Sequence, residues 1–373
     1  MKIFHIIPTM EIGGAESFLE KIVILSPHTE HHEIICLKRR GKIGDRLVAN
    51  GFKVHQLNLN NIFVLPFCFF KLVNFLRSEN PAVVQTWMYH SDLLGGIAAK
   101  FASCKKIIWS IRCTNTLTLR GSSISGYFSM KLCSWLSRLI PHKIICVAHK
   151  AMEQHIEYGY DSSKMLVVQN GFHLNTVTLN RSHITKIRDN ISIDEDSLVI
   201  GSVARFNAYK DHLNFINAAL KVINKFPKTI FLMVGTDITK ANLELFNIIQ
   251  SAGREKNFRL LGEYHEMDDI YQAMDIFCLH SRSEGFPNVL GEAMSSGLPC
   301  ISTDVGDASE LLGNNGIIID PENHIELSNA MEKIILLSKE ERMRMGENAM
   351  ERVKAQYSIN KALNIYSQLY ASK

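Results

Sequence analysis

Short apolar runs alternate with helical stretches along this chain, and that alternation is the feature that most restricts its fold. Helices between successive strands allow the strands to run parallel, in a doubly wound sheet with helices on both faces. Ligands of such sheets bind beyond the carboxyl ends of the strands. We therefore expect an α/β fold with binding residues in the loops that follow strands. In the first half, the predicted strands are Lys2–Pro8, Glu33–Lys38, Lys53–Asn58, Ala82–Trp87, Lys106–Ile111, Lys143–Ala148 and Met165–Asn170.

A polar stretch divides the chain into two series of strands and helices. Phe172–Ser197 loses the apolar pattern and is rich in Asn, Thr, Ser and charged residues, and a new strand-like run begins at Leu198. The chain has 373 residues, which is enough for two domains with separate cores. We predict a Rossmann-like domain over residues 1–175, a linker over 176–197, a second Rossmann-like domain over 198–355 and a terminal helix over 356–373.

The composition excludes several classes of protein. Hydrophobic residues make up 46% of the chain and charged residues 21%, as in soluble globular proteins. No apolar stretch reaches the roughly 18 residues that span a bilayer, and the N-terminus lacks the pattern of a signal peptide. The eight cysteines include no Cys-x-x-Cys pair, so we expect free thiols in a reducing cytoplasm and no structural zinc site.

Positive charge is concentrated in the first half of the chain. Residues 1–175 hold 20 Lys and Arg against 11 Asp and Glu, whereas the remaining residues hold 21 against 26. The basic half either faces an anionic membrane surface or lipid, or reflects an incidental difference in surface composition. Asn61–Ser78 and Ser129–Lys143 mix aromatic residues, leucines and cations, and such helices lie either in the core or in a membrane interface.

The stretch Ser281–Gly297 combines a predicted anion site with two carboxylates. It predicts a strand end, a loop and a helix with Asn288 as its N-cap. Unpaired N–H groups and peptide dipoles at a helix start favour a negatively charged ligand. Glu284 lies in the loop and Glu292 one turn beyond the cap, which suits a ligand with hydroxyls and phosphates, such as a nucleotide sugar. The alternative is an ordinary strand–loop–helix unit with an acid near each end.

Two further loops carry candidate phosphate-binding residues. Arg205 and Lys210 are five residues apart on one loop, and both side chains can reach a single pyrophosphate. The alternative is a solvated loop with two cations. Gly13 and Gly14 follow the first strand and let the backbone approach a ligand. This loop is not the Gly-x-Gly-x-x-Gly fingerprint of dinucleotide-binding dehydrogenases.

Seven residues separate Glu284 from Glu292 within EGFPNVLGEAM, and this string closely resembles the signature of family 4 retaining glycosyltransferases. The Arg205 and Lys210 pair and the loop Gly13-Gly14-x-Glu are similar to other elements of that family. The resemblance implies the GT-B fold, in which two Rossmann-like domains face each other across a cleft and a terminal helix crosses back to the first domain. It also implies transfer of a sugar from a nucleotide donor with retention of anomeric configuration.

The resemblance also assigns roles to individual residues. Arg205, Lys210 and the helix start Asn288–Leu290 would bind the departing diphosphate and stabilise its growing charge. Glu284 would hold hydroxyls of the donor sugar, and Glu292 would hold the ribose hydroxyls. Neither glutamate needs to act as a nucleophile.

Two other residues take roles from the same resemblance. His90 would contact the transferred sugar or its leaving group, although a lone histidine at a strand end is often only structural. Tyr264 lies in LLGEYHEMDDI, which resembles the family's loop along the nucleobase. The predicted catalytic residues are Glu284, His90, Arg205 and Lys210, and the predicted binding residues are Gly13, Gly14, Arg205, Lys210, Tyr264, Phe286, Asn288, Val289, Leu290 and Glu292.

We therefore predict a retaining hexosyltransferase that moves a sugar from a nucleotide-diphosphate sugar, with UDP favoured, to a glycan or lipid-linked acceptor in cell-surface polysaccharide biosynthesis. It would act in the cytoplasm, peripherally on the inner face of the membrane. No Asp-x-Asp motif stands in the expected site, so we expect no essential metal, no other cofactor and no nucleic-acid partner. The alternatives are a GT-B nucleotide-sugar epimerase or hydrolase and a non-catalytic nucleotide-sugar-binding protein.

Overall fold

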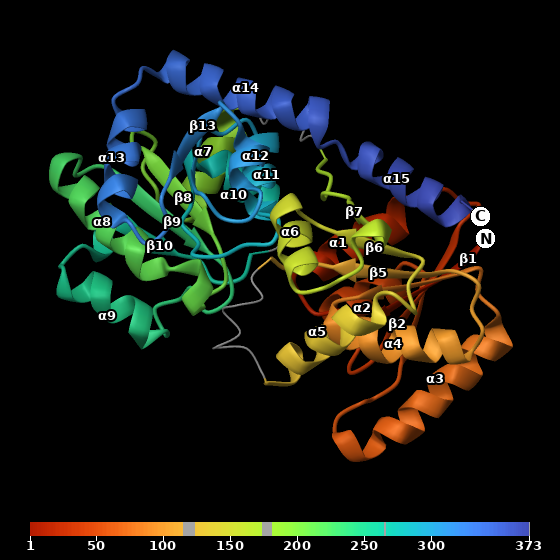
Figure 1. Cartoon of the computed structure of the whole chain (residues 1–373). Coiled ribbons are helices and arrows are strands. Elements are labelled where there is room, and N and C mark those ends of the chain that lie inside the picture. Colours follow the sequence, from red (N-terminus) through yellow and green to blue (C-terminus); the bar gives the residue numbers. More distant parts are fainter. Residues whose placement is uncertain (115–123, 174–180, 265, 373) are drawn as a thin grey trace. The chain divides into compact units, whose positions relative to one another are not determined.

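The structure, a computed structural model, describes residues 1–114, 124–173, 181–264 and 266–372. The chain divides into two compact units, which Figure 1 shows in sequence colours. Unit 1 comprises Met1–Asn170 and Asn360–Lys373, and unit 2 comprises Gly171–Ile359. Each unit is built on one parallel β-sheet, so each has its own core and its own pair of sheet edges.

The sheet of unit 1 has the strand order of a doubly wound fold. Its seven described strands are parallel and lie in the order β3-β2-β1-β4-β5-β6-β7. The order reverses between β1 and β4, which is the switch point where ligands of such sheets bind. All the strands predicted in the first half are confirmed: β1 (Lys2–Ile7), β2 (His31–Cys36), β3 (Lys53–Gln56), β4 (Val83–Trp87), β5 (Ile107–Ile111), β6 (Lys143–Cys146) and β7 (Met165–Val167).

Helix α4 (Tyr89–Phe101) packs close to this sheet because its middle consists of small residues. A Cβ atom at Gly96 would lie 2.6 Å from Trp109 Nε1, and one at Gly95 would lie 3.0 Å from the side chain of Ile6. Trp109 and Ile6 are fully buried strand residues. The other described helices of the first 170 residues are α1 (Gly14–Leu25), α2 (Gly41–Ala49), η1 (Ile62–Val64), α3 (Leu65–Glu79), α5 (Ile124–Leu136), α6 (His149–Glu157) and η3 (Ser162–Lys164).

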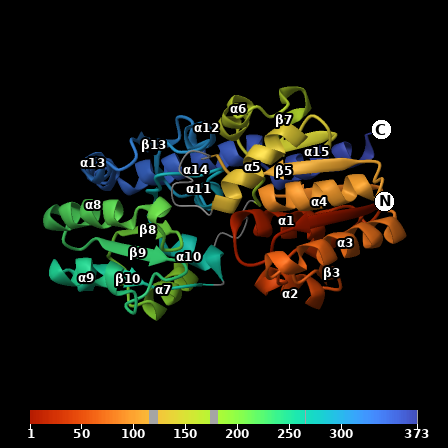
Figure 2. The ribbon, with the colours of Figure 1, turned by 60° about the horizontal axis from the view of Figure 1, so that its bottom comes forward.

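The amphipathic stretch 61–78 forms η1 and most of α3, and the stretch 129–143 spans the second half of α5, the turn after it and the first residue of β6. Helix α4 contacts both α3 and α5. Helices α3 and α4 run side by side in both ribbon views (Figures 1 and 2). Each amphipathic helix buries one face, as Leu72 on α3 and Cys133 on α5 show. The other face carries exposed aromatic side chains, with Phe67 72% exposed and Trp135 63% exposed. Core packing therefore accounts for one face of each helix and leaves the other in contact with solvent. No helix among the described residues is long and apolar enough to cross a membrane.

Helix α15 (Ile359–Ala371) brings the end of the described chain into unit 1. The Tyr370 hydroxyl donates to Gln85 Oε1 at 2.5 Å, and the Tyr366 ring lies 5.9 Å from the Phe18 ring. Both tyrosines are buried. Unit 1 is therefore completed by residues that are far from it in sequence.

The sheet of unit 2 follows the same doubly wound pattern. Its six described strands are parallel in the order β10-β9-β8-β11-β12-β13, and the order reverses between β8 and β11. The predicted α/β class is thus confirmed in both units. The strands are β8 (Val199–Val203), β9 (Ile230–Val234), β10 (Phe258–Leu260), β11 (Ile276–Leu279), β12 (Cys300–Thr303) and β13 (Gly316–Ile319). The helices that follow β8 are η4 (Ala208–Lys210), α8 (His212–Lys225), α9 (Leu243–Ser251), η5 (Glu255–Asn257), α10 (Met267–Ala273), α11 (Asn288–Ser295), α12 (Ala308–Leu312), α13 (His324–Ile335) and α14 (Lys339–Gln356).

Part of the predicted linker, 176–197, is an ordered helix of unit 2. Residues 176–180 lie outside the described residues, but α7 (Arg181–Asn190) follows them and contacts α10. Ile187 and Ile191 are buried at helical spacing. Arg188 donates to Asp275 Oδ2 at 2.9 Å and to the Ala273 carbonyl at 3.1 Å. The helix is held by a few apolar contacts and one buried arginine, which polar composition alone does not reveal.

We expect Gly96→Val to lower the free energy of unfolding of unit 1 by about 1–3 kcal/mol, because the new side chain needs the space that Trp109 occupies. Urea denaturation followed by tryptophan fluorescence measures this, since Trp87, Trp109 and Trp135 all belong to unit 1. The control is Glu153→Val at an exposed position on α6, where the lower helix propensity of valine costs less than about 1 kcal/mol. An equal decrease in the free energy of unfolding in the two variants would contradict close packing at Gly96.

Candidate active site

The loops after β8, β9, β11 and β12 meet at the carboxyl edge of the sheet of unit 2. Two glycines allow their backbones to approach closely. At Gly235 (φ +146°) a Cβ atom would lie 2.2 Å from the Ala204 carbonyl oxygen. At Gly306 (φ +53°) a Cβ atom would lie 2.2 Å from the Gly285 carbonyl oxygen. The loops that carry Arg205, Lys210 and Glu284 are therefore each pressed against a neighbouring loop.

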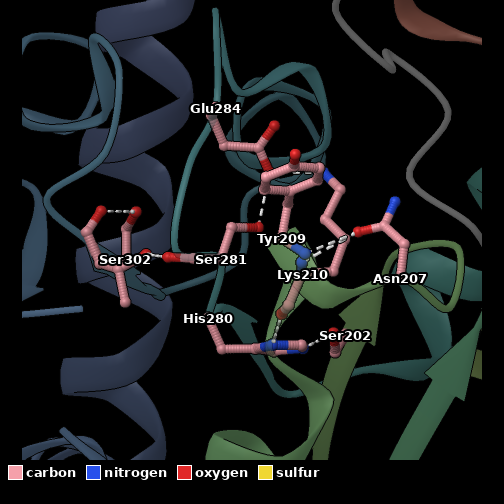
Figure 3. A network of polar contacts seen from close by, with 9 residues as sticks. Ser202, Asn207, Tyr209, Lys210, His280, Ser281, Glu284 and Ser302 are labelled. Atoms are coloured by element: carbon pink, nitrogen blue, oxygen red, sulfur yellow. Dashed lines mark hydrogen bonds and ion pairs between the residues drawn. The ribbon is translucent and has the colours of Figure 1, made fainter. Parts of the chain in front are cut away.

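An ion pair joins the loops on the two sides of the switch point in unit 2. Lys210, after β8, places its Nζ 2.5 Å from Glu284 Oε1, after β11. The Ser281 hydroxyl donates to the same carboxylate oxygen at 2.6 Å (Figure 3). The side chains of Lys210 and Glu284 are only 18% and 12% exposed. Two residues predicted from separate motifs thus form one polar centre.

The backbone around Lys210 is fixed by a short capped turn. The Asn207 side chain accepts hydrogen bonds from the backbone N–H groups of Tyr209 and Lys210, at 3.0 and 3.1 Å. Asp211 then adopts a left-handed conformation with φ +53° before α8 begins. Arg282 donates to Asp211 Oδ1 at 2.9 Å, and its own N–H donates to the Tyr209 carbonyl at 2.7 Å. Side-chain and backbone bonds therefore tie the loop after β8 to the loop after β11.

The buried, neutral side chain of His280 binds the backbone of Lys210 (Figure 3). Burial, and then the charge of His212, hold the pKa of His280 well below its usual range. In its neutral form, the His280 Nδ1–H donates to the Lys210 carbonyl at 2.5 Å, and Nε2 accepts from the Ser202 hydroxyl at 2.6 Å. The Phe215 ring stacks on the imidazole at 4.6 Å between centroids. The backbone of Lys210 is therefore fixed through His280, which follows β11, and through Ser202 on β8.

Helix α11 begins one residue earlier than the capping pattern predicts. Its N-cap is Pro287, without a side-chain cap, and Asn288 is the first helical residue, so the prediction of Asn288 as the N-cap is wrong. The physical reason is the preceding side chain: Phe286 is buried and its ring stacks 6.0 Å from that of Phe172. This contact fixes the chain before the proline, and the helix starts directly after it.

The first turn of α11 has fewer available donors than a simple helix start. The Asn288 N–H donates to the Phe286 carbonyl at 2.9 Å, and the Leu290 N–H donates to the Pro287 carbonyl at 3.1 Å. The Leu290 side chain is fully buried. Within the described part of the chain, the Val289 N–H has no such backbone acceptor. Of the predicted helix-start donors, Val289 is the one best placed to bind an anion.

Glu292 lies on the following turn of α11 and contacts a buried tyrosine. The Tyr271 hydroxyl of α10 donates to Glu292 Oε2 at 3.0 Å. Burial, and then the charge of Glu292, raise the pKa of Tyr271 well above its usual range, so this hydroxyl remains a donor. Arg205 is exposed on the loop after β8, and Tyr264 is half-buried on the loop after β10. The structure therefore places the predicted residues of unit 2 on loops that follow strands or on helix α11, with Glu292 in its second turn.

The predicted residues of unit 1 flank its own switch point. Gly13 is the N-cap of α1, after β1, and a Cβ atom there would lie 2.4 Å from Glu16 Oε2. Gly14 is the first residue of that helix. His90 lies in the first turn of α4, after β4, and is exposed. Partial desolvation, and then the charge of Lys38, lower the pKa of His90, which favours a neutral imidazole near pH 7.

Two family models match consecutive parts of this chain. "Glycosyltransferase Family 4" matches residues 12–176, and "Glycosyl transferases group 1" matches residues 183–352. The chain belongs to glycosyltransferase family 4. It is therefore a glycosyltransferase, and the prediction of family and enzyme class is confirmed.

Relatives and solved structures agree with this assignment. The chain is 25% identical over 314 residues to the capsular polysaccharide biosynthesis glycosyltransferase CapH of Staphylococcus aureus. This alignment covers 83% of each protein. It is 26% identical over 274 residues to the UDP-Gal:alpha-D-GlcNAc-diphosphoundecaprenol alpha-1,3-galactosyltransferase of Escherichia coli, covering 70% of this chain and 68% of that one. Anabaena Alr3699/HepE in complex with UDP-glucose matches with a TM-score of 0.87 at 20% identity, over 100% of both chains. This likeness confirms the GT-B fold.

Sequence reasoning missed the residues that position the ion pair. Ser202 and Ser281 carry no motif, and His280 reads as the last residue of an apolar strand. Asn207 gave a signal, because an asparagine side chain in a loop commonly accepts hydrogen bonds from the backbone N–H groups that follow it in a turn. Across the described ranges, no group of three or more His, Cys, Asp or Glu side chains could hold a metal. That the reaction needs no metal stays a prediction.

We expect the stability of unit 2 to fall as the pH drops below about 6.5, because the unfolded state binds a proton that folded His280 excludes. His280→Asn should remove up to about 1.4 kcal/mol per pH unit of this slope. Asparagine can keep a donor near the Lys210 carbonyl, so the variant should fold. Hydrogen exchange of the β11 amides between pH 5 and 7 measures the slope, and His183→Asn at an exposed site is the control. An unchanged slope in His280→Asn would show that this imidazole does not contribute.

Proposed function

We propose that this enzyme transfers a hexose from a UDP-sugar to a lipid-linked acceptor during the synthesis of a cell-surface polysaccharide. The observation that carries the proposal is the contact between Lys210 and Glu284 at the switch point of unit 2. A cation and a carboxylate held together there suit a ligand that has both a diphosphate and sugar hydroxyls. The names of the relatives supply the donor and acceptor classes, since one is named for UDP-Gal and a diphosphoundecaprenol substrate.

When the donor binds, Lys210 would exchange its partner Glu284 for the diphosphate of the donor. Lys210 now has Glu284 as its counter-charge, at 2.5 Å. A bound diphosphate would take over that role, which keeps the mostly buried ammonium compensated and leaves Glu284 to accept hydrogen bonds from the sugar. Arg205 would add a second, planar cation from the other end of the same loop. Glu292 would hold the ribose hydroxyls, and His90 of unit 1 would contact the transferred sugar.

Catalysis would then be largely electrostatic. The leaving diphosphate gains negative charge as the glycosidic bond breaks, and positioned cations and N–H donors stabilise that charge. Lys210 is suited to this role because Asn207 and neutral His280 hold its backbone before any ligand binds. Preorganised groups of this kind do not need to move during the reaction, so their full stabilisation reaches the transition state.

The surface of unit 1 supports an acceptor at a membrane. The exposed faces of η1, α3 and α5 carry Phe63, Phe67, Phe70, Phe128 and Trp135, each at least 63% exposed. Aromatic residues beside lysines and arginines favour binding to the interface of an anionic bilayer. We accordingly place the enzyme peripherally on the inner face of the membrane, where a lipid-linked acceptor would be presented.

We expect Lys210→Ala and Glu292→Ala to fold normally and to lose about 10²–10³-fold in turnover, because each removes a charged contact to the donor. Transfer from UDP-sugars measures turnover, and thermal melts with UDP measure binding. At a hundredfold excess of ligand over Kd, UDP should stabilise the parent by about 2.7 kcal/mol and the Lys210 variant by less. Lys221→Ala and Glu347→Ala, at exposed sites of unit 2, are the matched controls. Near-parental turnover in Lys210→Ala and Glu292→Ala would overturn the site assignment.

We expect activity to survive removal of divalent ions, because Arg205 and Lys210 supply the positive charge that a metal provides in other glycosyltransferases. The assay is sugar transfer after dialysis against EDTA, compared with the same enzyme supplied with magnesium. Rates within about twofold of each other are the expected outcome. Activity abolished by EDTA and restored by magnesium would show instead that a metal carries the charge.

A further inference from the structure

The edge of the unit 1 sheet opposite His90 and the Gly13-Gly14 loop has its own cluster of cations. Lys105 and Lys106 precede β5, Lys143 is the first residue of β6, and Lys164 precedes β7. These strands are neighbours in a parallel sheet, so their amino ends meet at one edge. Lys100, near the end of α4, completes the group. All five lysines line one cavity of about 670 Å³, which we call the lysine cavity.

Two of these lysines have a structural role. Lys106 Nζ donates to the Tyr370 carbonyl at 3.3 Å and to the Ser372 hydroxyl at 2.9 Å. Lys164 Nζ donates to the carbonyls of Ser137 and Arg138, at 3.1 and 2.7 Å. Both lysines bind chain segments at or just beyond the C-terminal ends of α15 and α5, where unpaired carbonyls favour a cation. Their hydrogen bonds within the protein therefore explain the positions of Lys106 and Lys164 without a ligand.

The other three lysines have no such explanation. Lys100, Lys105 and Lys143 are exposed side chains that line the cavity, and none forms a hydrogen bond or ion pair with a described residue. No carboxylate is among the described residues of the lining. His142 also lines it, and its pKa is lowered first by partial desolvation and then by the charges of lysines that include Lys100. Positive charge is therefore gathered around one concave site without a counter-charge from the lining.

We propose that the lysine cavity binds a phosphorylated ligand through Lys100, Lys105 and Lys143. Ammonium groups bind phosphate oxygens as point charges, and several of them around one cavity match the multiple charge of a phosphate better than that of a single carboxylate. Binding would also relieve the mutual repulsion of the lysines. The phosphate belongs either to a lipid headgroup or to a soluble compound. Leu139, which lines the cavity and is 59% exposed, lies three residues beyond the C-terminal end of α5.

This site is distinct from the donor site, so it can be tested without measuring sugar transfer. The experiment maps the reactivity of individual lysines toward an amine-acetylating reagent by mass spectrometry, at low ionic strength. The probes are inorganic tripolyphosphate, vesicles of phosphatidylglycerol and vesicles of phosphatidylcholine. We expect an anionic probe to slow the labelling of Lys105 and Lys143 several-fold relative to Lys221.

Variants separate the cavity from general surface charge. K100Q/K105Q/K143Q should weaken binding of the protecting probe about tenfold, equivalent to the loss of one or two charged hydrogen bonds. The control K221Q/K228Q/K256Q removes the same charge from exposed sites of unit 2 and should change binding less than about twofold. Lys106 and Lys164 are left intact so that the fold is preserved.

The outcomes decide both the proposal and the source of the phosphate. Protection by tripolyphosphate supports a soluble phosphorylated ligand, and protection by phosphatidylglycerol vesicles alone supports a lipid headgroup. The proposal would be overturned if neither anionic probe protected the lysines, or if phosphatidylcholine vesicles protected them equally. It would also be overturned if the two triple variants lost probe binding to the same extent. None of these results depends on whether the enzyme uses a UDP-sugar.

Discussion

The ion pair between Lys210 and Glu284 joins the two loops that flank the switch point of unit 2, and the rest of the candidate site is arranged around it. Both charged groups are mostly buried, so each loses much of its hydration and needs a close partner. Ser281 adds a donor to the carboxylate, and Asn207 and His280 hold the lysine backbone. A site built this way keeps its shape without ligand because its charges already compensate each other.

The two sheets use the same topological rule with different chemistry. In unit 2, the carboxyl edge carries a compensated charge pair, whereas in unit 1 the corresponding edge carries glycines and a histidine with a lowered pKa. The amino edge of unit 1 differs from both, since lysines gather there without carboxylates in the cavity lining. The three edges therefore differ in charge, and these differences come from the side chains at the ends of the strands.

Patterns in the sequence predicted the strands of unit 1, the family and the loops that carry the candidate site, because these depend on hydrophobic periodicity and on local strings such as EGFPNVLGEAM. They did not predict features that depend on contacts between distant segments. Asn288 has a strong local preference for an N-cap, but Phe286 packs on Phe172 and the helix starts after Pro287. Likewise, Arg188 looks like a surface residue until Asp275 is seen beside it. In the sequence, His280 looks like the polar end of an apolar strand. Its partners are far from it along the chain, since Ser202 lies on β8 and Lys210 on the loop after β8.

The insertion of α15 into unit 1 also bears on how the chain acquires its structure. Tyr370 binds Gln85 in the interior, although 285 positions separate them. A growing polypeptide emerges from the ribosome in order, so unit 2 can be complete while unit 1 still lacks this helix. During that interval, the seat of Tyr366 and Tyr370, which includes Phe18, His5 and Gln85, is open to solvent. The first Rossmann-like domain can therefore mature only after α15 has been synthesised, and a nascent chain that stalls before Asn360 would leave the seat of both tyrosines unfilled.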